Sequence, residues 1–297
     1  MKTKIHWLRR AKGSSFFVSV LFFTFHFSLF TFLSSCSKEL DVDYQDVEPQ
    51  YVVEGTINED SCLVILSQTS NLSGSTAQLP MDDAVVTVTL PDGSTQQLRR
   101  LSENRFSAPI HAEAGKTYGL KVEVAGKTFT SQSTMQKPPY LYRCYVNWQN
   151  VATVKMLVSR FVVRDDSTME NFYYCHIYRA NKSYAWDVAN DRWASASHAI
   201  NYPVAFVSED VINDDKPEDA DKVLHVGDTL HFHVRSIDKA AFDYFYALHQ
   251  NGSKAINPKS NIQGGCYGYF SAYSERRMAV VIPQELMDDK EFKANNL

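Results

Sequence analysis

Two histidines in a predicted strand have the spacing of metal ligands. His231 and His233 are two residues apart, so both side chains project from one face of the strand, and His225 lies close by in the sequence. A polar outer strand face explains the pair more simply, because no third ligand follows at a firm spacing. The sequence therefore predicts no metal site and no cofactor, and His231 and His233 are the residues to inspect if a metal is present.

Aromatic side chains are the better functional clue. Tyr184, Trp186, Trp193 and Tyr202 fall in one stretch with weak strand signals and many small residues. Exposed rings on a loop give a large contact area at low entropic cost, which suits stacking on sugars or anchoring a protein partner. The alternative is that the rings belong to a sandwich core or a covering flap. These four residues are the candidate ligand-binding site, for an oligosaccharide or a peptide.

Motifs for catalysis are missing. The chain has no Gly-x-Ser-x-Gly, no His-Glu-x-x-His and no glycine-rich phosphate loop. Cys266 and His249 would make a nucleophile and a base only if the fold brought them together. The acidic stretch 209–221 lacks the glycine and the terminal glutamate of a helical calcium loop, so an acidic surface loop is favoured. We expect a protein that is not an enzyme, the alternative being a secreted hydrolase without a recognisable motif.

Short strands must position these residues. The predicted strands of a first group are rich in Val, Ile, Thr and aromatic residues. Turn sequences such as Pro91-Asp92-Gly93 and Ala125-Gly126 separate them from one another. About seven strands in about 85 residues indicate a β-sandwich of immunoglobulin or prealbumin type. The predicted strands are 51–57, 62–68, 84–90, 95–101, 105–109, 117–124 and 127–133.

A pair of prolines, Pro138-Pro139, marks a domain boundary, since neither can donate to a strand ladder. Longer strands are predicted beyond it, at 140–148, 154–164, 172–180, 202–207, 229–236 and 277–283. One helix, 238–249, carries Phe242, Phe245 and Tyr246 on one face. The overall prediction is a mainly β chain with a β-sandwich domain at 50–136 and a second β-rich domain at 139–297, with a packed helix near 238–250.

The N-terminus has the pattern of a bacterial lipoprotein signal. Basic residues precede an apolar run, Phe16 to Leu33, which ends in Leu33-Ser34-Ser35-Cys36. The sequence predicts a signal peptide at 1–35, lipidation of Cys36 and an acidic tether at 36–49. A membrane-spanning anchor is the alternative, but the run is short and interrupted by His26. Attachment to a membrane through the lipid is expected.

Charge excludes one class of partner. Without residues 1–35 the chain keeps 25 Lys and Arg against 34 Asp and Glu, a formal charge of −9. This balance argues against nucleic acid as a partner. Four cysteines remain beyond Cys36, namely Cys62, Cys144, Cys175 and Cys266. Their spacing matches no metal template, and it leaves disulfides and buried thiols both open.

Several motifs occur in an order that resembles a known family. They are Asp41 to Asp43, Tyr51 to Ile57, Gly115 to Tyr118, Asn171 to Tyr174, and Asn257 to Ile262 followed by Gly264-Gly265 and Gly268-Tyr269-Phe270. Together they are similar to the Bacteroidota lipoprotein family of domain of unknown function 4249, over residues 36–281. Cys266 departs from that pattern, where a small or aliphatic residue is expected.

The resemblance implies an outer-membrane lipoprotein that faces outward and works beside a TonB-dependent transporter. We therefore expect a lipid-anchored binding or accessory protein of a nutrient uptake system, contacting the transporter or its oligosaccharide or peptide cargo. A structural or adhesive surface module built of β-sandwiches is the alternative.

Overall fold

Alternating burial along the strands defines the core. In β7 (Thr117–Val124) every second residue from Tyr118 to Val124 is buried, and the residues between them are half-buried or exposed. β8 (Lys127–Thr134) follows after Ala125 and Gly126, which have φ angles of 49° and 73°. Two positive φ angles suit the right-handed twist of a two-residue hairpin. The hairpin predicted at Ala125-Gly126 is confirmed.

The computed structural model describes residues 48–70, 78–214, 216–251 and 258–288. They belong to one compact unit, Val47–Leu297. The predicted signal peptide, Cys36 and the tether up to residue 47 lie outside the described residues. No helix in the described part of the chain has the length and apolar character needed to cross a membrane.

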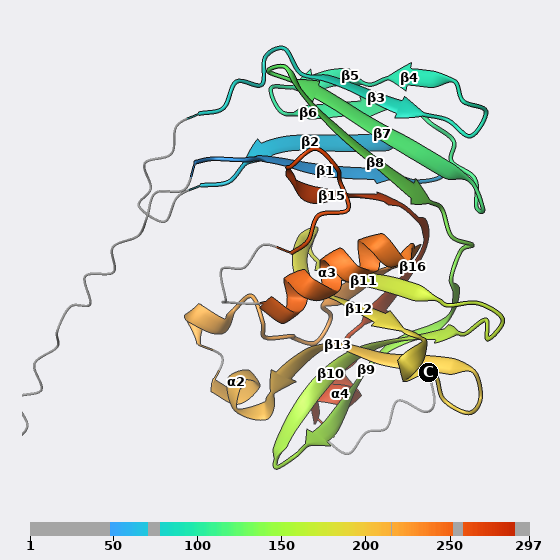
Figure 1. Cartoon of the computed structure of the whole chain (residues 1–297). Helices are drawn as coiled ribbons and strands as arrows, with labels where there is room; N and C mark the ends of the chain where they lie inside the picture. Colours follow the sequence, from blue (N-terminus) through green and yellow to red (C-terminus); the bar gives the residue numbers. More distant parts are fainter. Residues whose placement is uncertain (1–47, 71–77, 215, 252–257, 289–297) are drawn as a thin grey trace, which may run out of the picture. The chain divides into compact units, whose positions relative to one another are not determined.

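Two sheets pack face to face around the first core, which we call the N-terminal sandwich. One sheet has the order β15-β1-β2-β6-β5 and the other the order β4-β3-β7-β8 (Figure 1). The strands besides β7 and β8 are β1 (Tyr51–Ile57), β2 (Cys62–Gln68), β3 (Val85–Thr89), β4 (Thr95–Gln97), β5 (Arg99–Ser102), β6 (Arg105–Ala108) and β15 (Tyr267–Ala272).

One strand of the N-terminal sandwich comes from the far end of the chain. β15 pairs in parallel with β1, from Val52 opposite Tyr267 to Ile57 opposite Ala272. Phe270 and Ala272 are fully buried in the first core, together with Ile262 and Cys266. Residues 262–272 therefore complete the N-terminal sandwich, although the predicted range 139–297 assigned them to the second domain.

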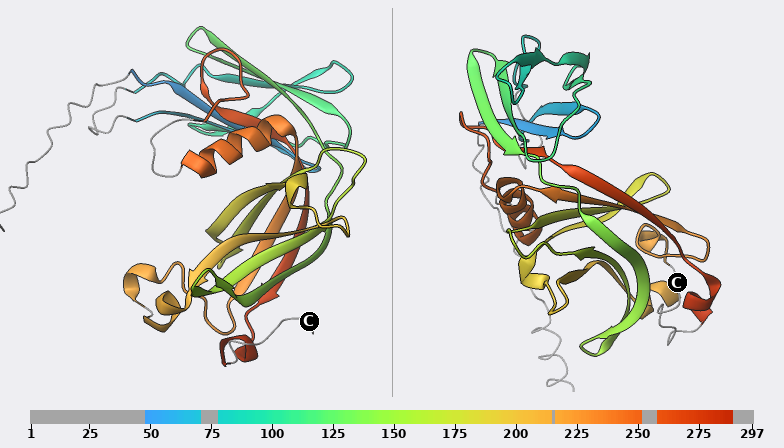
Figure 2. Two further views of the ribbon diagram at one scale, coloured as in Figure 1. Left: turned by 60° about the horizontal axis from the view of Figure 1, so that its bottom comes forward. Right: turned by 90° about the vertical axis from the view of Figure 1, so that its right-hand side faces the viewer.

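A second pair of sheets encloses the second core, which we call the C-terminal sandwich. Its sheets have the orders β13-β10-β9 and β12-β11-β14-β16, and Figure 2 shows them facing one another. The strands are β9 (Tyr140–Val151), β10 (Val154–Arg164), β11 (Phe172–Arg179), β12 (Lys182–Asn190), β13 (Ala199–Ser208), β14 (Thr229–Ile237) and β16 (Ser274–Val281).

The predicted helix is α3 (Lys239–Asn251). It begins at Asp238, whose carboxylate accepts a hydrogen bond from the Ala241 amide at 2.9 Å. Figure 1 shows α3 lying against β11 and β12. Its aromatic residues Phe242 and Phe245 are buried in one cluster with Tyr174 of β11 and Val188 of β12. The short helices are η1 (Asp191–Trp193), α2 (Glu209–Asp214), η2 (Pro217–Asp219) and α4 (Gln284–Asp288).

The predicted fold class is confirmed: the chain is mainly β, with a β-sandwich followed by β-rich structure that carries a packed helix. Two strands were missed, β12 and β15. The acidic stretch 209–221 forms α2 and η2 within its described part, where Asp214 pairs with Lys216 and Asp219 with Lys222.

Candidate ligand-binding site

A cavity of about 410 Å³ opens between α3 and the edge where β12 and η1 lie beside β13. We call it the aromatic groove, because five rings line it: Phe172, Trp193, Tyr202, Phe242 and Tyr246. Its other lining residues are Glu170, Val188, Asn190, Asp191, Arg192, Lys239, Asp243 and Gln250. The groove thus combines aromatic surfaces with a rim of amides and charged groups.

Trp193 is the most exposed ring of the groove, with 55% of its surface accessible. It is carried by η1, which Asn190 caps by accepting a hydrogen bond from the Arg192 amide at 3.2 Å. Asp191, the next residue, accepts a hydrogen bond from the backbone amide of Asn171 with both carboxylate oxygens, each at 3.0 Å. These contacts fix the start of the turn, and the backbone that carries Trp193 is therefore held in place before any ligand arrives.

Tyr202 forms the floor of the groove. It is 8% exposed, and the Trp193 ring stands edge-on to it at 5.0 Å between centroids. The Tyr202 hydroxyl donates to Asp187 Oδ2 at 3.0 Å. Burial raises the pKa of Tyr202, and the neighbouring Asp187 raises it further. The phenol therefore stays protonated and acts as a fixed donor that locks the ring.

Asp187 is a buried carboxylate just below the groove. Its Oδ1 accepts the Val188 amide at 2.7 Å and lies 3.5 Å from His249 Nδ1. Burial raises the pKa of Asp187, and the hydrogen bond from Val188 and the nearby His249 oppose that effect. Its contacts orient Tyr202 and His249, which is a positioning role beneath the groove.

The opposite wall belongs to α3. Tyr246 is 49% exposed and stacks on Phe242 at 5.7 Å with an interplanar angle of 20°. Lys239 and Asp243, one turn apart on the same helix, form an ion pair at 2.6 Å at the rim. Tyr246 was expected only as part of the packed helix face. Its i+4 spacing from Phe242 is the signal that two rings of α3 stack on one another.

The four predicted site residues are not together. Trp193 and Tyr202 line the aromatic groove. Trp186 is half-buried under α3, stacked on Tyr174 at 5.7 Å and close to Phe245 and His249. This ring belongs to the packed cluster between β12 and α3.

Tyr184 is also removed from the groove. Its hydroxyl donates to the Lys222 carbonyl at 2.9 Å, and Arg179 lies over its ring. Burial raises its pKa to about 12. Tyr184 and Trp186 lie in β12, whereas the prediction had placed them in an exposed loop. β11 and β12 are joined by the two-residue turn Ala180-Asn181, whose φ angles are 47° and 63°; Asn181, a residue type that favours such turns, is the sequence signal for this hairpin.

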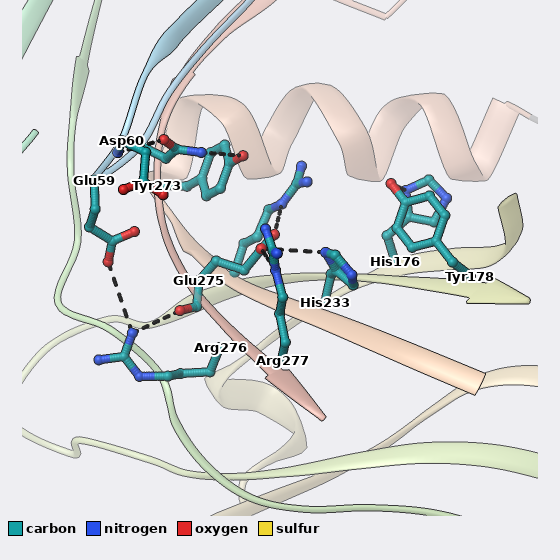
Figure 3. Close-up of polar contacts among 11 residues, drawn as sticks. Glu59, Asp60, His176, Tyr178, His233, Tyr273, Glu275, Arg276 and Arg277 are labelled. Atoms are coloured by element: carbon teal, nitrogen blue, oxygen red, sulfur yellow. Dashed lines mark hydrogen bonds and ion pairs between the residues drawn. The ribbon is translucent and has the colours of Figure 1, made fainter. Parts of the chain in front are cut away.

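His233 takes part in an ion-pair cluster (Figure 3). Its Nδ1 lies 3.4 Å from Glu275 Oε1, and Arg235 donates to Glu275 Oε2 at 2.8 Å. His176, beside Tyr178 in the same view, is engaged by the hydroxyls of Tyr178 and Ser183. Within the described residues, no group of three or more His, Cys, Asp or Glu side chains is placed to hold a metal ion.

The remaining candidate groups are separated by the fold. Cys266 lies in the first core, whereas His249 lies on α3 beside Asp187. All four described cysteines are buried free thiols, so the question left open by their spacing is answered in favour of thiols. Burial raises the pKa of Cys62 and Cys144 to about 12 and that of Cys266 to about 11. Such thiols are unreactive packing residues.

Comparison with known proteins gives one extensive match. The sequence model of a family described as "Domain of unknown function (DUF4249)" matches residues 37–278. No curated protein matches the chain. Among solved structures, a two-domain fibronectin type III segment of chicken tenascin is 9% identical, with a TM-score of 0.22, covering 79% of this chain and 99% of that one. That TM-score is too low to bear on fold or function.

Proposed function

We propose that this chain, which belongs to the DUF4249 family of domains of unknown function, is a binding protein that holds an oligosaccharide in the aromatic groove. We further propose that it is anchored through a lipid on Cys36 at the outer membrane, faces outward and serves a TonB-dependent uptake system without catalysing a reaction.

The observation that supports binding is the exposure of two large rings on opposite walls of one groove. Trp193 projects from a turn fixed by Asn190 and Asp191, and Tyr246 lies on α3 across the groove. Two exposed rings that face one cavity form an apolar patch, and apolar patches rimmed by polar residues mark interaction sites. Rigid rings lose little entropy on binding.

The rim favours a sugar over a purely apolar ligand. Amides of Asn190 and Gln250 and carboxylates of Asp191 and Asp243 surround the rings. Binding sites that place a few polar groups around aromatic surfaces use them to fix ligand orientation. A sugar ring presents C–H groups on its face and hydroxyls at its edge, which matches this arrangement. A peptide offers fewer hydroxyls for such a rim.

The proposal for the anchor depends on the sequence. The basic flank, the apolar run and Leu33-Ser34-Ser35-Cys36 are what a lipoprotein signal requires. An anchored protein with an exposed groove can hold a ligand close to a transporter, and this raises the local concentration of the ligand at the transporter.

The groove is tested with purified mature chain and a panel of soluble oligosaccharides of the glucan, xylan and mannan classes, by isothermal titration calorimetry. Trp193→Ala and Tyr246→Ala should each weaken binding about tenfold, the effect of losing one aromatic contact of about 1 to 1.5 kcal/mol. Their melting temperatures should stay within a few degrees of the parent, because both rings are exposed.

Phe206→Ala is the matched control, since Phe206 is an exposed ring on β13 that does not line the groove. Trp186→Ala should behave differently from both groove variants. Its ring is packed against Tyr174 and Phe245, so removing it should lower stability by about 2 to 4 kcal/mol. If no member of the panel binds, or if binding survives both groove variants, the sugar-binding proposal fails.

The link to a transporter has its own experiment. Purification of the native protein from detergent-solubilised membranes should bring down a TonB-dependent transporter, and a deletion strain should take up its nutrient more slowly. Absence of both effects would favour the alternative of a structural or adhesive surface module.

A further inference from the structure

A second cavity lies between β9 and β16, the edge strands with which the two sheets of the C-terminal sandwich end on one side. Its volume is about 490 Å³. We call it the seam groove. Its inner lining is apolar, with Val146, Met278, Val280, Pro283 and Leu286 among its members. No residue that lines the aromatic groove also lines the seam groove, so the two cavities are separate.

The seam groove runs along strand edges. Its lining includes the consecutive residues Tyr142 to Val146 of β9 and Met278 to Val281 of β16. Consecutive residues of a strand point to opposite faces of its sheet. A cavity that touches both faces of both strands must therefore lie beside their edges.

Both strands have one unpaired side. In the described sheets β9 is bonded only to β10, and β16 only to β14. The Cys144 amide, on the free side of β9, donates to Met278 Sδ at 3.1 Å. A thioether sulfur is a weak acceptor. A carbonyl of an added strand would satisfy this amide better.

Arg143 supplies a positive charge that has no ion-pair partner among the residues that the structure describes. It lines the seam groove, and its Nε is buried without a hydrogen-bond partner among the described residues. Its guanidinium lies 4.3 Å from the centre of the Tyr145 ring. A buried N–H without a partner destabilises a structure, and a carboxylate is the partner that a guanidinium binds best. The site is therefore complementary to an acidic group.

The surroundings of the seam groove are basic and apolar. Arg276 and Arg277 follow one another on β16 just before the lining residues; their side chains are exposed and pair with Glu59 at 3.9 Å and with Glu275 at 2.5 Å. Tyr142 and Val281 are also exposed, with 69% and 57% of their surfaces accessible. An exposed strand edge with apolar side chains readily pairs with another chain.

We propose that an extended peptide segment of a partner protein, with alternating apolar and acidic residues, docks in the seam groove by β-strand addition. Alternate side chains of such a segment point to opposite sides. One set fills the apolar cavity, and one carboxylate of the other set pairs with Arg143. The backbone bonds to a free strand edge, which supplies affinity without sequence dependence.

The probe is a fluorescein-labelled ten-residue peptide of alternating valine and aspartate, measured by fluorescence anisotropy with the mature chain. It should bind saturably. A peptide of alternating valine and lysine should bind at least about tenfold more weakly, since it cannot pair with Arg143. A valine–aspartate peptide with two central prolines should also bind weakly, because proline removes backbone donors.

The protein variants separate charge from fold. Arg143→Gln should weaken binding of the valine–aspartate peptide about tenfold. Arg105→Gln, the same change at an exposed position on β6, should leave the affinity for this peptide unchanged. Thermal melts check that both variants fold. The peptides with lysine and proline need no variant, so they test the proposal even if Arg143→Gln does not fold.

Three results would overturn the proposal. They are failure of the valine–aspartate peptide to bind, equal binding of the peptide with lysine, and binding that Arg143→Gln leaves intact. A concentration-dependent dimer that Val281→Lys dissociates would show instead that a second copy of this chain occupies the seam groove. None of these results depends on whether a sugar binds in the aromatic groove.

Discussion

Glu275 forms ion pairs with three residues of the C-terminal sandwich. Its side chain is 7% exposed and accepts from Arg235 at 2.8 Å and from Arg277 at 2.5 Å, with His233 at 3.4 Å (Figure 3). Burial by itself would raise the pKa of Glu275, but the hydrogen bonds from His233, Arg235 and Arg277 outweigh it and lower the pKa to about 2. The carboxylate thus joins β14 to β16 through charge.

Glu275→Gln should destabilise the fold by about 3 kcal/mol at pH 7, because it leaves Arg235 without its countercharge. Urea unfolding measures the change. Glu59→Gln is the control, since Glu59 contacts Arg276 only at 3.9 Å and both are exposed; its effect should be below about 0.5 kcal/mol. A loss for Glu275→Gln no greater than for Glu59→Gln would contradict this account.

The pH dependence of stability follows from the same residue. A carboxylate with a pKa of about 2 in the folded state and an ordinary value of 4.5 when unfolded stabilises the fold above pH 4.5. That stability, about 3 kcal/mol, is lost as the pH falls from about 4.5 to about 2. The parent should therefore show a decline in this window that is smaller in Glu275→Gln. Parallel acid titrations of the two proteins by circular dichroism measure it.

Residue types alone identified part of the aromatic groove. Trp193 was predicted because a tryptophan among small residues stands out, and Tyr202 because it lies nearby in sequence. Tyr246 was missed as a groove residue because its helical spacing equally fits a packed face. Trp186 was wrongly predicted to be exposed. Whether its ring is exposed depends on the position of α3, which covers it, and the sequence around Trp186 does not reveal that position.

At the scale of elements, β15 is the strand that local patterns could not reveal. Its sequence, Tyr267 to Ala272, has an irregular burial pattern and contains Gly268. Gly268 has a φ of 106°, and a Cβ at this position would overlap the Val53 backbone. Glycine is therefore required where β15 approaches β1, and it weakens the strand signal in the sequence.

Gly268→Ala should destabilise the protein by more than about 3 kcal/mol, since backbone strain and overlap with Val53 add together. Gly93→Ala is the matched control, because Gly93 also has a positive φ, 85°, but no atom lies within 4 Å of the added Cβ. It should lose only about 1 kcal/mol. Equal losses in thermal unfolding would mean that the contact with β1 is unimportant.

At the scale of the whole molecule, the two sandwiches do not correspond to two consecutive segments of the sequence. Turn sequences and burial periodicity predicted most strands of both sandwiches, because those signals are local. They could not predict the parallel pairing of β15 with β1, because that pairing depends on contacts between residues far apart in the chain. A boundary at Pro138-Pro139 therefore separates most, but not all, of the two cores.

A fragment of residues 48–136 should fail to fold cooperatively. It lacks Ile262, Cys266, Phe270 and Ala272, which are buried in the first core, and it leaves the edge of β1 unpaired. Nuclear magnetic resonance spectra should show poor dispersion, in contrast to residues 48–288. Addition of a synthetic peptide of residues 258–273 should restore dispersion, and a cooperative melt of the fragment alone would contradict the prediction.

The parallel pairing of β1 with β15 also dictates the order of events during synthesis. The partner of Val52 is Tyr267, more than 200 residues later in the chain. Since a chain leaves the ribosome from its N-terminus, β1 emerges more than 200 residues before the strand that pairs with it. Contacts of such high sequence separation form slowly. The sandwich that starts first is therefore completed only after β9 to β14 of the other sandwich have been made, and a nascent chain must keep the open edge of β1 from other chains throughout that interval.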